Sequence, residues 1–176
     1  MLPHPTAPRA TIPAMTDATH SSADLAPEAQ RALAVRLFNR TWELLDSERD
    51  AAGDREVLAT AMASRLLWQG VGTDENLAAG DWLVSHVASR LGHGDLALDF
   101  AAAAHERVST SNEQLPAWLV ASTLEGLARA HAVAGHDEER DAFAADARSV
   151  LEAVDDDEDR EIVEGQLATV PGLAQQ

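Results

Sequence analysis

Residues 92–104 read GHGDLALDFAAAA and residues 135–147 read GHDEERDAFAADA, so the chain contains two copies of a similar segment, called here the repeated phrase. The coincident pairs are Gly92/Gly135, His93/His136, Phe100/Phe143, Ala101/Ala144, Ala102/Ala145 and Ala104/Ala147. In each phrase a glycine turn precedes alanines at spacings of three and four, which let two helices approach closely, while the phenylalanine fills the gap beside them. A single helical hairpin of this kind cannot bury its apolar face, so such hairpins stack.

The chain on either side of these phrases also has a helical pattern. Apolar residues recur at spacings of three and four, and no segment alternates at period two over more than a few residues. The predicted helix boundaries are Pro27, a break at Gly53-Asp54, a cap at Thr73 or Asp74, the Gly92 turn, a capping box at 111–114, the Gly135 turn and a cap at Asp155. The sequence therefore predicts an all-α fold of stacked antiparallel helical hairpins, with about seven helices and almost no strand.

The two ends of the chain differ from this helical part. Residues 1–26 carry four prolines among Thr, Ala, Ser and His without apolar periodicity, which is typical of a disordered leader. We expect one helical-repeat domain over residues 27–170 and a frayed tail over 171–176. Met1 and Met15 both remain candidates for the start of translation.

The repeated phrase resembles the tetratricopeptide-repeat family, which places a glycine at the turn and small residues five and twelve positions later. The positions that fit are Gly92, Ala97 and Ala104 in the first phrase and Gly135 and Ala147 in the second. Arg140 departs from the template, and a period of about forty rather than thirty-four implies longer helices. The resemblance implies an α-solenoid (TPR-like) whose concave surface binds a peptide or partner protein.

Composition excludes several classes of function. The net charge is −17, so the surface repels the phosphate backbone of nucleic acids, and we expect no nucleic-acid partner. No apolar run is long enough to span a membrane, and the first thirty residues lack the apolar core of a secretory signal. The absence of cysteine removes disulfides, thiol catalysis and thiolate metal sites. We expect a cytoplasmic protein without a cofactor.

One cluster of side chains is a candidate binding site. Arg36, Arg40 and Glu43 share a helical flank, and arginine or histidine again lies close to tryptophan in the next two predicted helices. The candidate residues are Arg36, Arg40, Glu43, Arg65, Trp68, Trp82 and His86. If antiparallel helices bring them into one groove, they suit an anionic ligand. The other interpretation is that the tryptophans are ordinary core and the arginines form surface ion pairs, and it is the favoured one because amphipathic packing explains the tryptophans without any ligand.

Other chemical motifs are missing. The acidic run at 155–159 resembles the start of a calcium loop, but Arg160 and Gln166 stand where that loop needs Gly and Glu. No metal-binding histidine motif, catalytic triad order, phosphate loop or dinucleotide fingerprint occurs. The sequence therefore favours an interaction module that binds a partner protein, a peptide or a second copy of itself. The alternative is a small-molecule-binding or enzymatic helical domain that uses the Arg/Trp/His groove for an anionic ligand.

Overall fold

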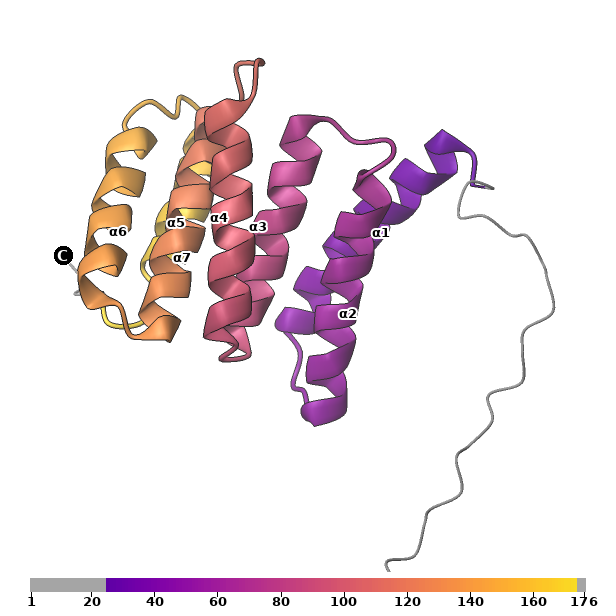
Figure 1. The fold of residues 1–176 in the computed structure, drawn as a ribbon, viewed down its shortest axis with the longest axis horizontal. Helices are drawn as coiled ribbons and strands as arrows, with labels where there is room; N and C mark the ends of the chain where they lie inside the picture. The colour runs from indigo at the N-terminus through magenta and orange to yellow at the C-terminus, as the bar shows by residue number, and fades with distance from the viewer. Residues whose placement is uncertain (1–24, 174–176) are drawn as a thin grey trace, which may run out of the picture.

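The computed structural model describes residues 25–173, and over this range the fold consists of seven helices without strands. The helices are α1 (Pro27–Leu45), α2 (Ala51–Trp68), α3 (Asp74–Arg90), α4 (Gly94–Thr110), α5 (Ala117–Ala134), α6 (Asp137–Leu151) and α7 (Asp157–Leu167) (Figure 1). The all-α prediction is confirmed. The predicted disordered leader over residues 1–26 and the predicted frayed tail over 171–176 lie outside the described residues except for 25–26 and 171–173.

Each helix packs mainly against its neighbours in sequence. The closest pairs are α1 with α2, α3 with α4 and α5 with α6, and α2 and α4 also pack against the helix that follows. Helix α3 additionally contacts α1 and α5, so these three odd-numbered helices form an inner row, and α7 packs against α5 and α6. Figure 1 shows α1 to α6 side by side in chain order, with α7 next to α5.

The alanines of the repeated phrase lie where the spacing predicts. Ala101 and Ala104 on α4 are fully buried, and so are Ala144 and Ala147 on α6. Ala102 and Ala145, which lie between the buried alanines, are exposed. Both phenylalanines are only half-buried, so they close the edges of the core rather than its centre.

The two glycine turns share one geometry. Gly92 has φ 75° and Gly135 has φ 80°, the left-handed region that glycine adopts without steric penalty. In each turn the following histidine N–H donates 2.9 Å to the carbonyl five residues earlier, of Ala88 and of His131. This is the Schellman arrangement that closes a helix. The repeated phrase therefore encodes the same helix end twice.

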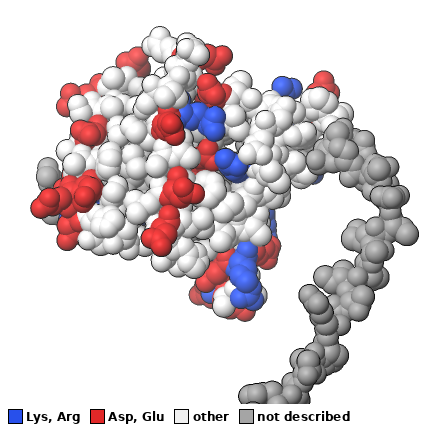
Figure 2. Space-filling view, in the orientation of Figure 1, with Lys and Arg blue, Asp and Glu red and all other residues white. Residues whose placement is uncertain are grey.

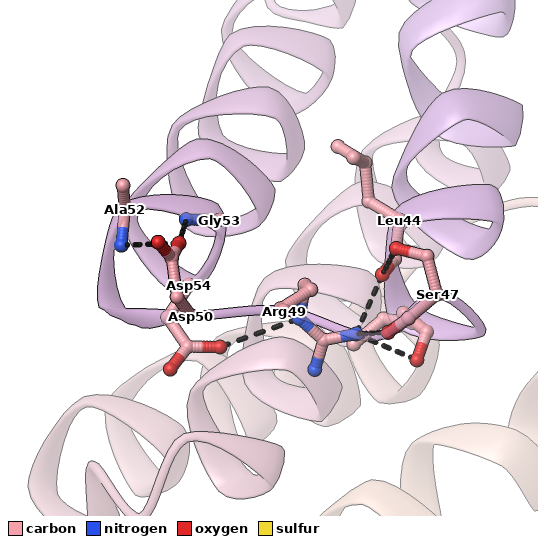
Figure 3. Close-up of polar contacts among 8 residues, drawn as sticks. Leu44, Ser47, Arg49, Asp50, Ala52, Gly53 and Asp54 are labelled. Carbon is pink, nitrogen blue, oxygen red and sulfur yellow. Dashed lines mark hydrogen bonds and ion pairs between the residues drawn. The ribbon is translucent and has the colours of Figure 1, made fainter.

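The connection between α1 and α2 differs from its prediction, because Gly53 lies inside the first turn of α2 instead of breaking the chain. Figure 3 shows the cause. The Asp50 carboxylate accepts the backbone N–H groups of Ala52 and Gly53 at 3.0 Å, which starts the helix early. Arg49 caps the end of α1, since its Nη1 donates to the carbonyls of Leu44 at 2.5 Å and Leu45 at 2.7 Å.

Two other predicted caps are wrong and one is confirmed. The capping box at 111–114 does not form, because α5 starts at Ala117 behind Pro116, and Ser111 instead donates to Asp74 at 3.0 Å. Helix α7 is capped by Asp156 rather than Asp155. Thr73 caps α3 as predicted, in a capping box with Asn76.

We expect alanine substitution to separate the turn glycines from a glycine within a helix. Gly135→Ala should lower the free energy of unfolding by about 1 kcal/mol, because alanine disfavours positive φ. The control Gly165→Ala lies on α7, where an added Cβ meets no neighbour, and should raise it by about 0.5–1 kcal/mol. Urea denaturation measures both, and equal effects of the two substitutions would contradict this account of the turn.

Candidate functional site

A pocket of about 350 Å³ opens on the inner row of helices. Helices α1, α3 and α5 contribute one tryptophan each, and α7 forms the remaining wall. The residues that line it are Phe38, Trp42, Trp82, Trp118, Ser122, Asp159, Ile162, Val163 and Gln166. Most of this lining is apolar, and both its volume and its aromatic character are typical of binding sites.

The aromatic rings form a packed cluster in and behind the pocket. The ring centroids of Trp42 and Trp82 lie 5.8 Å apart, and the His86 ring lies 5.1 Å from Trp42 and 5.9 Å from Trp82. Gly126 on α5 leaves room for this cluster, because a Cβ there would lie 2.9 Å from the Trp82 ring. The indoles are therefore held in place by backbone as well as by side chains.

His86 is a neutral part of this cluster. Burial lowers the pKa of His86 to about 3, and the positive charges of Arg129 and Arg90 act in the same direction. Its Nδ1 atom is buried without a hydrogen-bond partner. His86 thus packs against the two indoles, tilted by 56° to each, as an uncharged ring rather than serving as a cation for an anionic ligand.

A buried ion pair lies behind Trp82. The Trp82 indole N–H donates to one oxygen of Glu125 at 3.4 Å, and Arg129 Nε donates to the other oxygen at 2.7 Å. Both charged side chains are almost completely buried. Burial raises the pKa of Glu125, while Arg129 and the indole N–H oppose that rise. The pair joins the floor of the pocket to α5.

The same arginine fastens α7 to α5. Arg129 Nη2 donates to the Gln166 carbonyl at 2.7 Å and to the Thr169 hydroxyl at 2.8 Å, and Nη1 donates to the Thr169 carbonyl at 3.3 Å. These groups lie at the C-terminal end of α7, whose last carbonyls have no partners within the helix. Val163 and Leu167 bury the inner face of α7 against the core. This docking places Asp159 and Ile162 at the pocket.

The structure brings together only part of the predicted binding cluster. Trp82 and His86 lie together with Trp42, as described. Arg36 and Arg40 are exposed on α1. Arg40 pairs with Glu43 at 3.0 Å, with both side chains more than half exposed, so this pair contributes little to stability.

Arg65 and Trp68 take other positions. Arg65 Nε donates at 2.5 Å to the fully buried carboxylate of Asp81, and its guanidinium lies over the Phe100 ring at 5.6 Å. Arg107 approaches the other Asp81 oxygen at 3.6 Å, an ion pair too long for a hydrogen bond. Trp68 is buried beside the loop that leads to α3. Arg65 therefore joins α2, α3 and α4 and does not line the pocket.

Several pocket residues did not stand out in the sequence. Phe38, Trp118, Asp159 and Ile162 were not among the predicted site residues, although each lines the pocket. The available signal was one tryptophan in each of the first, third and fifth helices, although the second helix also carries one, Trp68, outside the pocket. The contribution of α7 has no local signal, because it depends on where Arg129 docks that helix.

No family model matches the chain, and neither a curated protein nor a solved structure matches it. Within residues 25–173, no three His, Asp or Glu side chains cluster closely enough to hold a metal ion. The Nδ1 atoms of His131 and His136 lie 3.2 Å apart, but no third such side chain among the described residues joins the two histidines. No helix in the described part of the chain combines the length and apolar character needed to cross a membrane.

The buried histidine predicts a specific pH dependence. Between about pH 6.5, where an unfolded histidine titrates, and about pH 3, where folded His86 titrates, the unfolded chain binds one more proton. Stability from neutral His86 is therefore complete above that range and is lost as the pH falls through it. His86→Phe keeps an aromatic ring and removes this proton. As the pH decreases through this range, the unfolding free energy of the wild type relative to His86→Phe should fall by up to about 1.4 kcal/mol per pH unit. Parallel profiles of unfolding free energy against pH for the two proteins would show that His86 titrates normally.

Proposed function

We propose that this protein is a TPR-like helical-repeat interaction module that binds a segment of a partner protein. The observation that carries the proposal is the aromatic pocket, to which three helices of the inner row and α7 all contribute. A side chain of the partner segment occupies this pocket, and the surrounding inner row contacts the rest of the segment. A few residues contribute most of the binding energy at protein interfaces, and tryptophan is enriched among them.

The TPR-like assignment is supported by two features of the structure. The helices pack in sequential pairs whose odd-numbered members also contact one another, as a stack of hairpins requires. The helix ends at Gly92 and Gly135 have the same dihedral geometry and the same hydrogen bonds. Arg140 departs from the family template in α6, and its side chain lies against Gly172, which follows α7.

The lining of the pocket favours binding over catalysis. Asp159 is the one titratable residue in it, so the lining pairs no general acid with a general base. The alternative function, recognition of an anionic small molecule, gains no support from the lining either, because no arginine contributes to it.

The test uses substitutions inside and outside the pocket. Peptides selected from a displayed library on the wild-type protein should bind Trp118→Ala and Ile162→Ala more weakly, tenfold or more for the tryptophan, because a central aromatic contact contributes about 2 kcal/mol. Leu66→Ala is the matched control, since Leu66 is the most exposed large apolar side chain on α2 and does not line the pocket. Affinities are measured by isothermal titration calorimetry.

Circular dichroism of each variant separates loss of binding from loss of folding. Equal affinities for the wild type, Trp118→Ala and Ile162→Ala would show that the pocket is not the binding site. Weaker binding to Leu66→Ala alone would move the site to α2.

A further inference from the structure

We infer that the pocket takes a positively charged side chain, arginine or lysine, from the partner segment. The inference rests on the proposed function and specifies the chemistry of the residue that enters the pocket. A neutral apolar side chain is the competing occupant. Three properties of the pocket, namely its three tryptophans, its polar groups and its charge, favour the cation.

The tryptophans of the lining supply the first argument. Trp42, Trp82 and Trp118 all contribute to one lining. A ring face carries negative electrostatic potential and attracts ammonium and guanidinium groups, with tryptophan the most effective ring. The methylene groups of an arginine or lysine also pack well against apolar walls such as Phe38 and Ile162.

The polar groups of the lining supply the second argument, because their free atoms accept hydrogen bonds. Asp159 presents a carboxylate, and the Oε1 atom of Gln166 is buried without a hydrogen-bond partner. Arg160, the residue after Asp159, is already bonded to Asp157 at 2.7 Å and to the Val154 carbonyl. Across residues 25–173, no arginine or histidine lies within ion-pair distance of Asp159. The pocket therefore has acceptors to offer and no cation of its own.

The overall charge supplies the third argument. The chain carries a net charge of −17, and the first turn of α7 holds Asp157, Glu158 and Asp159. Figure 2 shows acidic side chains spread over the face in view, with basic side chains at a few places only. A field of this sign attracts basic segments and speeds their association.

The probes are short Gly/Ser peptides that differ in one central residue, which is arginine, leucine or glutamate. We titrate each into the full-length protein and follow indole signals by NMR. The arginine peptide should bind about fivefold to thirtyfold more tightly than the leucine peptide, as a desolvated cation–π contact allows. The glutamate peptide should bind most weakly. Added salt should lower the affinity for the arginine peptide more than the affinity for the leucine peptide.

Two substitutions of equal charge locate the effect. Asp159→Asn should weaken binding of the arginine peptide severalfold and reduce the salt dependence of that binding. The affinity for the leucine peptide should stay unchanged. Glu138→Gln changes the net charge equally but lies exposed on α6, which does not line the pocket, and should change neither affinity more than slightly. Circular dichroism confirms that both variants remain folded.

The outcomes separate this inference from the proposed function. If the leucine peptide binds at least as tightly as the arginine peptide, and Trp118→Ala weakens it, the pocket is an apolar-anchor site and the cationic inference is overturned. If Asp159→Asn and Glu138→Gln weaken binding of the arginine peptide equally, the attraction comes from the net charge of the protein and the pocket does not recognise the cation. If no peptide changes the indole NMR signals, and the library-selected peptides bind Trp118→Ala as tightly as the wild type, the proposed function itself fails.

Discussion

The guanidinium of Arg129 is the group on which the inner side of this protein depends. Its five N–H donors face one way toward the Glu125 carboxylate and the other way toward the carbonyls that end α7. One side chain thereby neutralises a buried acid and caps the helix that packs against α5. The position of α7, and with it the pocket wall that carries Ile162, follows from this contact.

Close approach of backbones is the second constraint. Buried alanines let α4 and α6 lie near their partners, and Gly126 lets Trp82 lie against α5. Arginine has a matching role at the helix ends. Arg49 closes α1 (Figure 3), and Arg129 closes α7. In a chain without lysine, the planar guanidinium supplies several donors in fixed directions, which suits it to capping more than one carbonyl at once.

Much of the fold could be predicted from local sequence, and much of the site could not. Helical periodicity and the Gly92 and Gly135 turns depend on residues close in the chain, so they were read correctly. Gly53 was misread because the cap at Asp50 outweighed the preference of glycine for breaks. Arg65 looked like a ligand-binding group because its partner Asp81 lies on the next helix, a pairing that spacing along one helix does not reveal. The docking of α7 is likewise a long-range result.

The central claim is that the Glu125–Arg129 pair holds α7 and thereby completes the pocket. Hydrogen exchange followed by mass spectrometry on Glu125→Gln/Arg129→Met tests it directly, because the double substitution removes both buried charges and leaves neither unpaired. We predict fast exchange in α7 and loss of the pocket wall, with slow exchange retained over α1 to α6. Unchanged protection of α7, or equal loss of protection in every helix, would contradict the claim.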